Sequence, residues 1–333
     1  MDIFKTDADW CDIIAIDYEV MKMENIRTVF LGTPEFACVI LKALVENGYN
    51  VAAAVAQPDK PVGRKQIIQP TPIHALADQY GIPVLQPIKL RKEYQMVLDV
   101  KPDLIVTCAY GQMIPDEILQ YPRYGCVNVH PSLLPKYRGG APIHHAVWNG
   151  DSETGVSIMK MVAAMDAGAV YAQKKTAIGP DETTGELSAE LESISAELLI
   201  QTLPRIIQGL KGTEQDDSQV VLARNISKEQ EQLFFQKEPI DELYNHARAL
   251  IDWPISYGAI KDTRIKFYKV RKRTEEQKAE PGTVIGFKDH AMEIACIGGT
   301  LLVYELQMAG HNRMTADVFE NGAGRSLLGG KFE

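Results

Sequence analysis

The chain has 333 residues, 45% of them hydrophobic and 24% charged, with a formal net charge of −9 at pH 7. This length favours two domains, and no apolar run reaches the ~18 residues that a transmembrane helix needs. The acidic balance argues against a general nucleic-acid-binding protein, but it leaves room for a local basic surface.

The first 24 residues show no clear pattern of strands or helices that would make them part of a fold. Their charges are mostly acidic, so they lack the basic region of a secretory signal. Met21 and Met23 stand directly before the first convincing strand, and we expect one of them to be the authentic start. Residues 1–24 would then be a misassigned N-terminal extension.

The cysteines are scattered along the chain without a C-x-x-C pair: Cys11, Cys38, Cys108, Cys126 and Cys296. This pattern predicts reduced thiols in a cytoplasmic protein, with neither a disulfide framework nor a metal site. Most of these cysteines are expected to be small core residues.

Strands and helices are expected to alternate along the first third of the chain. We predict strands at 27–31, 51–56, 82–85 and 103–108, and helices at 35–47 and 89–99. Such alternation is typical of a doubly wound α/β fold, with a mostly parallel sheet covered on both faces. The turn at Gly32 lacks the second and third glycines of a dinucleotide fingerprint, which argues against NAD binding.

A further strand is expected to end at Asn128-Val129-His130, because Pro131 lacks the N–H that a continuing strand would need. Strand alternation places Asn128 and His130 on one face, about 6.6 Å apart along the chain. Their N–H groups could therefore converge on a developing oxyanion, as acyl transfer requires. On spacing alone, a polar strand end with a solvated histidine stays open as the alternative.

The elements that follow predict the end of the first domain and a second, smaller one. We expect a helix at 142–149, strands at 154–161 and 170–178, a helix at 184–208 and a polar linker at 209–236. A helix at 240–251 and five short strands between 257 and 306 predict a small β-barrel-like (OB-like) domain over 237–333.

Basic residues gather on one expected strand of this second domain. Seven of them, interleaved with Phe267 and Tyr268, are Lys261, Arg264, Lys266, Lys269, Arg271, Lys272 and Arg273. They indicate either a charged edge strand that resists unwanted pairing or a surface that contacts the phosphates of a nucleic acid.

The run from Asn128 to Pro142 has a distinctive order, Asn-x-His-Pro-Ser-Leu-Leu-Pro-x-Tyr-Arg-Gly-Gly-Ala-Pro. It resembles the folate-dependent formyltransferases, and among them especially those that act on methionyl-tRNA. The resemblance covers most of residues 26–330. It implies a catalytic domain over 25–208 and a tRNA-binding domain over 237–333. The implied reaction moves a formyl group from 10-formyltetrahydrofolate to the α-amino group of charged initiator tRNA.

The resemblance also implies site residues. Asp166, which by itself marks only a turn, joins Asn128 and His130 as a catalytic residue, although the family commonly has a second acid where this chain has Ala169. A hydrogen bond from Asp166 would orient His130, which would act as a general acid or as a fixed donor. The expected folate-binding residues are Tyr110, Gly111, Gln112, Met113, Ile114, Ser132, Leu133, Leu134 and Pro135.

A long basic loop is expected at 57–72, and the resemblance implies that it contacts the acceptor arm of tRNA. The family often has Lys or Arg where this chain has Gln66, Ile67 and Ile68, which bears on the strength of that contact. The implied tRNA contacts outside the second domain are Lys60, Arg64, Lys65 and Arg138. The implied protein is a monomer with no metal and no membrane partner.

Three alternatives stay open. Related formyltransferases act on an amino-sugar nucleotide or on glycinamide ribonucleotide, although these small substrates need neither a basic loop nor a basic second domain. A formyltetrahydrofolate hydrolase would use water in place of the amine, and would be expected to carry a regulatory domain. From a different class, a catalytically silent RNA-binding protein is conceivable, but the intact Asn128, His130 and Asp166 count against it.

Overall fold

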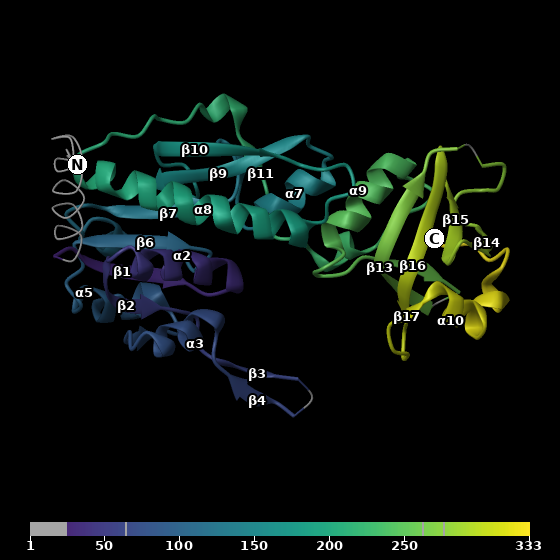
Figure 1. Ribbon diagram of the computed structural model, residues 1–333, viewed down its shortest axis with the longest axis horizontal. Helices are drawn as coiled ribbons and strands as arrows, with labels where there is room; N and C mark the ends of the chain where they lie inside the picture. The colour runs from purple at the N-terminus through teal and green to yellow at the C-terminus, as the bar shows by residue number, and fades with distance from the viewer. Residues whose placement is uncertain (1–24, 64, 262, 276) are drawn as a thin grey trace, which may run out of the picture. The chain divides into compact units, whose positions relative to one another are not determined.

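The computed structural model describes residues 25–333 except Arg64, Asp262 and Glu276. The extension expected at residues 1–24 lies outside the described residues. The chain divides into two compact units (Figure 1). The first comprises the chain up to Arg138, Gly155–Lys175 and Ala189–Leu222, and the second comprises Gly139–Thr154, Thr176–Ser188 and Ala223–Glu333. The domain boundaries drawn from the sequence stay predictions.

A seven-stranded sheet organises the first part of the chain (Figure 1). Its strands are, in spatial order, β10 (Val170–Ala177), β9 (Glu153–Lys160), β7 (Cys126–His130), β6 (Leu104–Cys108), β1 (Arg27–Gly32), β2 (Asn50–Val55) and β5 (Val84–Leu85). The five strands from β7 to β5 are parallel, whereas β9 is antiparallel to β7. The mostly parallel α/β sheet predicted from the sequence is confirmed.

The central strands are apolar because both faces of the sheet are covered. All five residues of β6 are buried, as are five of the six residues of β1. On one face, Val29 and Leu31 pack in a core with Leu90 and Val97. The helices along this part of the chain are α2 (Glu35–Glu46), α3 (Pro72–Gln79), α4 (Leu90–Glu93), α5 (Gln95–Leu98), α6 (Asp116–Leu119), α7 (Pro142–Trp148) and α8 (Thr184–Ile207), of which α7 belongs to the second unit. The helix predicted at 89–99 is thus two short helices.

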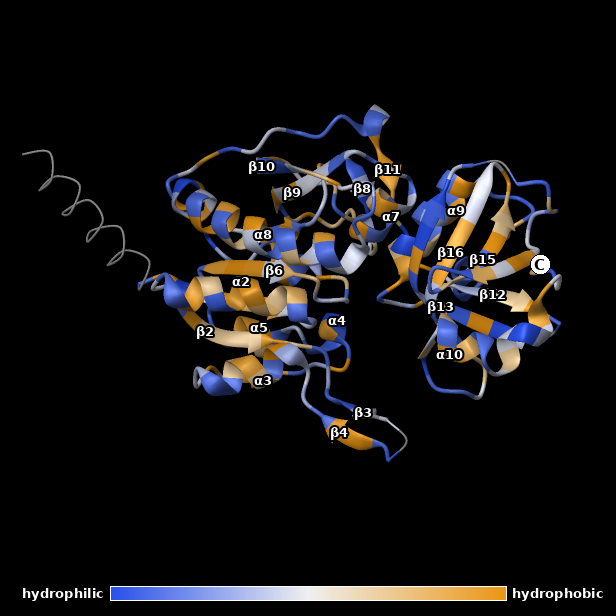
Figure 2. Cartoon of the chain, turned by 45° about the vertical axis from the view of Figure 1, so that its right-hand side comes forward, coloured by the Kyte–Doolittle hydropathy of each residue, from blue (hydrophilic) through white to orange (hydrophobic). Residues whose placement is uncertain are grey.

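The loop expected at 57–72 is instead a hairpin, in which β3 (Lys60–Val62) pairs antiparallel with β4 (Ile67–Gln69). Its base is closed by the carboxylate of Asp59, which accepts hydrogen bonds from the backbone of Thr71 at 3.1 Å and from Gln86 Nε2 at 2.7 Å, and contacts His74 Nδ1. Burial tends to raise the pKa of Asp59, but these hydrogen bonds outweigh it and lower that pKa. The clamp is therefore ionised at neutral pH. Ile67 and Ile68 on β4 remain exposed. Figure 2 shows β4 in the orange of hydrophobic residues.

The second unit contains an antiparallel sheet and α9 (Ile240–Leu250), which confirms the small β domain predicted there. Its strands run in the order β12 (Tyr257–Ile260), β13 (Thr263–Arg273), β16 (Gly299–Met308), β15 (Ala291–Cys296) and β14 (Val284–Lys288). A short β17 (Met314–Thr315) adds to β16 and leads into α10 (Ala316–Glu320).

The last five residues bridge the two outer strands of this sheet. The backbone N–H of Glu333 donates to Ala259 of β12 at 2.9 Å, while Gly329 and Gly330 exchange hydrogen bonds with Val284 of β14. Phe332, between these contacts, is fully buried. The C-terminal segment therefore closes the sheet into a barrel-like shape and supplies part of its core.

No helix in the described part of the chain has both the length and the apolar character that crossing a bilayer demands.

Candidate active site

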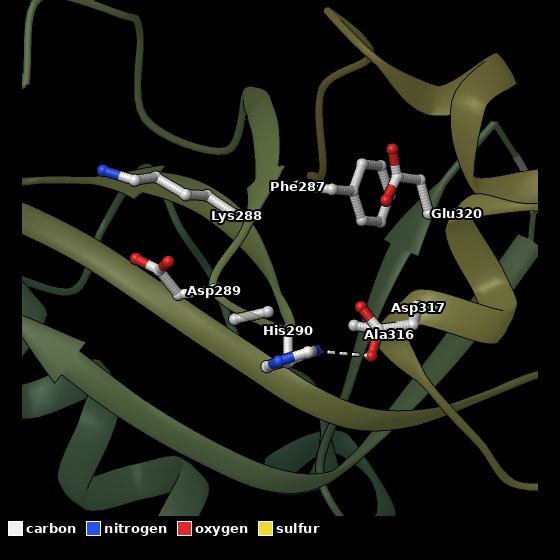
Figure 3. Close-up of a pocket in the computed structure, with 8 residues that line it drawn as sticks. Phe287, Lys288, Asp289, His290, Ala316, Asp317 and Glu320 are labelled. Carbon is white, nitrogen blue, oxygen red and sulfur yellow. Dashed lines mark hydrogen bonds and ion pairs between the residues drawn. The ribbon is translucent and has the colours of Figure 1, made fainter.

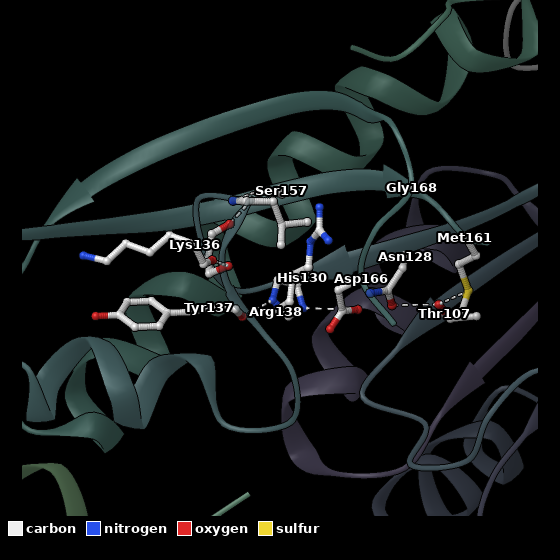
Figure 4. A network of polar contacts seen from close by, with 12 residues as sticks. Thr107, Asn128, His130, Lys136, Tyr137, Arg138, Ser157, Met161, Asp166 and Gly168 are labelled. Atoms are coloured by element: carbon white, nitrogen blue, oxygen red, sulfur yellow. Dashed lines mark hydrogen bonds and ion pairs between the residues drawn. The ribbon is translucent and has the colours of Figure 1, made fainter. Parts of the chain in front are cut away.

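Asn128 has its side-chain amide oriented by a neighbouring strand. Thr107, opposite it on β6, donates its hydroxyl hydrogen to Asn128 Oδ1 at 2.7 Å (Figure 4). Because Oδ1 accepts that bond, the amide nitrogen lies on the other side of the group. Among the described residues this nitrogen has no hydrogen-bond partner, so its two N–H groups remain available to a ligand.

His130 is buried at the end of β7, and its ring has one defined donor. Nε2 lies 2.9 Å from the carbonyl oxygen of Tyr137. A carbonyl only accepts hydrogen bonds, so Nε2 carries a hydrogen. The other nitrogen, Nδ1, faces the carboxylate of Asp166 (Figure 4). Nδ1 is therefore the nitrogen that can exchange a proton.

Asp166 lies 3.8 Å from His130 Nδ1, measured to Oδ1. The hydrogen bond expected between these side chains is therefore not formed, since this separation is too long for one. It is an ion-pair distance whenever the ring is protonated. Asp166 and Tyr137 both have left-handed backbones, with φ of 49° and 65°. Such conformations are costly for residues other than glycine and persist where the surroundings enforce them.

The loop after His130 is held by buried hydroxyl groups. Ser132 Oγ donates to the carbonyl of Lys136 at 2.7 Å, and Ser157 Oγ donates to the carbonyl of Ser132 at 2.6 Å. Ser157 Oγ also accepts from Leu134 N at 3.1 Å. Ser132 is thus engaged within the loop, and the structure places Leu133, Leu134 and Pro135 on the loop that it stabilises. Their contact with folate stays a prediction.

The segment from Tyr110 to Ile114 follows β6, at the edge where the parallel strands end. The carbonyl of Tyr110 accepts from Thr33 Oγ1 at 3.0 Å and from Gln57 Nε2 at 3.1 Å, which ties the ends of three strands together. The Tyr110 ring is buried, and this burial raises the pKa of its hydroxyl to about 12. Gly111 has a φ of 89°, which glycine adopts without strain. The segment therefore presents backbone groups rather than the tyrosine hydroxyl.

Two neighbours of Tyr110 differ in exposure. Gln112 is tied back to the fold, since its Oε1 accepts from Leu90 N at 2.9 Å and its Nε2 donates to Gln57 Oε1 at 3.2 Å. Met113 is exposed, whereas Ile114 is buried in the core. Of the predicted folate-binding side chains in this segment, Met113 is thus the one open to a ligand.

The residues predicted to contact tRNA lie on different elements of the structure. Lys60 and Lys65 are exposed on the hairpin, and Arg64 lies outside the described residues. Arg138 is only 9% exposed. It donates through Nε to Gln215 Oε1 at 3.0 Å and pairs through Nη2 with Asp217 at 2.8 Å. These partners give Arg138 a structural role. Its contact with tRNA stays a prediction.

The seven basic residues predicted on the second unit differ in whether they pair with a carboxylate. Lys272 pairs with Asp241 on α9, and Arg273 pairs with Glu293 at 3.0 Å. Within the described residues no ion pair joins the other five to a carboxylate: Lys261, Arg264, Lys266, Lys269 and Arg271. The pairing of β13 with β16 is irregular at Lys269. As a result, the buried positions Phe267 and Val270 are three residues apart instead of two. The strand therefore keeps an apolar inner face and a cationic outer one.

Each unit has a cavity among its described residues. One, of about 330 Å³, adjoins the loop after His130 and is lined by residues that include Leu134, Pro135, Gln173 and Gln215. The other, of about 300 Å³, lies in the second unit beside His290 and Asp317, which are hydrogen-bonded at 2.8 Å (Figure 3). It contains none of the predicted site residues. Among the described residues, no group of three or more His, Cys, Asp or Glu is arranged to hold a metal ion.

Family models match both parts of the chain. The formyl transferase model matches residues 26–203, and the formyl transferase C-terminal domain model matches residues 225–324. The chain belongs to the formyl transferase family. This confirms the family predicted from the order of residues between Asn128 and Pro142.

Individual relatives agree with this family. The methionyl-tRNA formyltransferase of Bacillus cytotoxicus is 44% identical over 302 residues, which are 90% of this chain and 96% of that protein. That of a Geobacillus species is 45% identical over 306 residues, 91% of this chain and 96% of that protein.

Solved structures of other proteins share the fold. HypX from Aquifex aeolicus in complex with tetrahydrofolic acid has a TM-score of 0.64 at 16% identity, covering 91% of this chain and 48% of that one. A Helicobacter canadensis N-formyltransferase in complex with folinic acid and dTDP-3-aminofucose has a TM-score of 0.63 at 18% identity, covering 84% and 98%. At these identities the likeness concerns the fold alone.

Three residues of this formyl transferase site were not predicted from the sequence. Thr107 orients Asn128, Ser157 holds the following loop, and Gln215 contacts the Asp166 loop. Thr107 could have been found from the expected parallel pairing of the strands that end near 108 and 130. Gln215 lies in the segment expected to be a linker, where nothing in the sequence pattern points to the site.

Proposed function

We propose that this formyl transferase moves the formyl group of 10-formyltetrahydrofolate to the α-amino group of methionyl-tRNA. The observation that carries this proposal is the 44–45% identity, over about nine-tenths of the chain, to methionyl-tRNA formyltransferases. The geometry of Asn128, His130 and Asp166 supports it, because the three side chains lie at one end of β7 and supply hydrogen-bond donors together with a proton-exchanging pair.

Asn128 is proposed to stabilise the oxyanion that forms when the amine attacks the formyl carbon. Its amide nitrogen is oriented by Thr107 and has no partner among the described residues, so it can donate without breaking an existing bond. One such preorganised donor typically lowers a barrier by about 2.7–4 kcal/mol. A free α-amino group titrates near ~7.7–8, so a substantial fraction of the nucleophile is already neutral at pH 7.

His130 is proposed to deliver a proton to the departing folate nitrogen through Nδ1. Its Nε2–H is committed to the carbonyl of Tyr137, which fixes the ring and leaves Nδ1 facing the reaction. Asp166 Oδ1 lies 3.8 Å from Nδ1, close enough to form an ion pair with the ring when Nδ1 carries a proton. The proton lost by the attacking amine can return to this pair, so that protons balance over one turnover.

The folate is proposed to lie between Tyr110–Ile114 and the loop carrying Leu133, Leu134 and Pro135. The first segment offers backbone groups and an exposed Met113, and the second follows His130 directly. Open parallel sheets commonly bind ligands at the carboxyl ends of their strands. The formyl carbon would then come within reach of Asn128 and His130.

The tRNA is proposed to contact the hairpin β3–β4 and the outer face of β13. Lys60 and Lys65 on the hairpin supply positive charge on a chain of net charge −9, and so do the five cations on or beside β13 that have no carboxylate partner among the described residues. Such contacts position a nucleic acid without reading its bases. We further propose that the protein acts as a cytoplasmic monomer.

Thr107→Val is expected to lower kcat about tenfold while leaving the KM for both substrates nearly unchanged, because one neutral hydrogen bond is typically worth ~0.5–1.5 kcal/mol. The valine keeps the volume but cannot hold the Asn128 amide. Steady-state kinetics would measure the effect, with Thr202→Val as the control, since the Thr202 hydroxyl bonds only within α8. An unchanged kcat in Thr107→Val would contradict the orienting role.

The proposed function is tested by incubating the protein with 10-formyltetrahydrofolate and methionyl-tRNA and assaying formyl-methionine on the tRNA. Free methionine and uncharged tRNA are the controls, and neither should be formylated. An amino-sugar nucleotide is tested in parallel, because one structural relative was solved with such a compound. Formylation of the sugar nucleotide without formylation of the tRNA would overturn the substrate proposal and keep the family.

A further inference from the structure

Gln215 makes three hydrogen bonds in the first unit, and two of them reach the loop that carries Asp166. Its Nε2 donates to the backbone carbonyl of Asp166 at 2.8 Å and to that of Gly168 at 2.7 Å. Its Oε1 accepts from Arg138 Nε at 3.0 Å. A carboxamide nitrogen has two hydrogens, so both are used on this one loop.

Arg138 fixes which way the Gln215 amide points. Because Arg138 can only donate, the amide oxygen faces the guanidinium and the nitrogen faces the loop. Asp217 also holds the guanidinium, through Nη2 at 2.8 Å. Arg138, Gln215 and Asp217 therefore form one chain of contacts that ends on the backbone of Asp166.

The Asp166 loop needs external support. Asp166 has a φ of 49°, which a residue with a side chain adopts only at a cost. On one side the loop is packed against β9, since a Cβ added to Gly168 would lie 1.9 Å from the carbonyl oxygen of Lys160. Lys160 N also donates to the carbonyl of Ala169 at 2.9 Å. Gln215 supplies bonds to the backbone of the same loop from another segment.

We infer that Gln215 is a positioning residue for Asp166, an inference that rests on the proposed function. Gln215 holds the carbonyls of Asp166 and Gly168, on either side of Ala167, and so sets where the Asp166 carboxylate stands relative to His130. The distance from Asp166 Oδ1 to His130 Nδ1 is 3.8 Å, close to the limit for an ion pair. A small displacement of the loop would therefore make or break this interaction. The segment around Gln215, which reads in the sequence as a linker, is thereby part of the active-site support.

Two substitutions separate this role from a merely structural one. Gln215→Leu removes all three hydrogen bonds at nearly constant volume. Gln215→Glu keeps the acceptor for Arg138 but places a carboxylate oxygen, which has no hydrogen to donate, against the two loop carbonyls. If Gln215 acts on the loop, both variants lose kcat, by about tenfold to a hundredfold, with a KM for tRNA that changes little. If it serves only to hold Arg138, Gln215→Glu behaves like the wild type, which would overturn the inference.

A double substitution tests whether the effect runs through Asp166. In an Asp166→Ala background, Gln215→Leu is expected to change kcat by less than about twofold, because residues that act as a unit are not additive. A full further loss in that background would contradict the inference. Gln219→Leu is the matched control, as its exposed amide lies in the same segment and donates to Asp216 instead. It should retain wild-type kinetics.

Hydrogen exchange distinguishes failure of this inference from failure of the proposed function. Backbone amides of residues 161–170 are expected to exchange faster in Gln215→Leu than in the wild type, whatever the substrate proves to be. If the wild type does not formylate methionyl-tRNA but exchange in this loop still rises, the support by Gln215 stands and the proposed function falls. If exchange is unchanged, the inference falls regardless of activity.

Discussion

His130→Asn is expected to lower kcat for formyl transfer by about 10²–10⁴-fold, the usual contribution of a positioned general acid or base. The structure leaves Nδ1 as the nitrogen that can exchange a proton, because Nε2–H is bonded to the carbonyl of Tyr137. Asparagine can place an N–H near the position of Nδ1 but cannot release or take up a proton there. Pre-steady-state measurement of formyl-methionyl-tRNA formation would report this step directly.

A comparison with His130→Ala decides between the two roles left open for the ring. If the ring is a general acid, the asparagine and alanine variants are about equally slow. An asparagine variant that retained more than about a tenth of the wild-type kcat would instead make His130 a fixed hydrogen-bond donor. His290→Ala, at an exposed histidine of the second unit, is the control and should leave kcat unchanged. Thermal unfolding of each variant checks that loss of activity is not loss of fold.

Phe332→Ala is expected to destabilise the second unit by about 3–5 kcal/mol, as is typical when a large buried aromatic is truncated. Phe332 is 0% exposed, and its ring lies 5.3 Å from that of Phe235 and 5.9 Å from that of Phe267, between centroids. The same residue donates its N–H to Gly282 at 2.9 Å within the segment that closes the barrel. Alanine keeps this backbone bond, so the expected loss comes from the cavity that the missing ring leaves in the core.

Urea unfolding followed by circular dichroism would measure this change. Leu328→Ala is the matched control, because that side chain is 51% exposed near the same end of the chain and its loss should cost no more than ~0.5 kcal/mol. A loss below about 1 kcal/mol for Phe332→Ala would show that the core closes without this ring. Since the outer face of β13 that we propose as a tRNA contact belongs to this unit, the variant should also bind tRNA less tightly.

Regular elements were predicted well from the sequence, because their periodicity is local. Short apolar runs predicted the strands β1, β2, β6 and β7, and the helical spacing of apolar residues predicted α8. None of these predictions required knowing which elements pack together. The hairpin at β3 and β4 was missed because its strands are three residues long and one contains a proline, which argues against a strand. The family followed from the order of residues after Asn128, which no single spacing rule would have supplied.

The amino-acid sequence alone thus determined the α/β class of the first part, the β class of the second, the family and the candidate trio Asn128, His130 and Asp166. Only the tertiary structure decided how that trio is held. Thr107 and Asn128 are hydrogen-bonded although 21 positions separate them in the sequence. Gln215 is hydrogen-bonded to Asp166, 49 positions away, and to Arg138, 77 positions away. These hydrogen bonds join side chains to distant partners whose approach is set by strand order and loop packing. Such contacts carry no periodicity, so the sequence pattern does not reveal them.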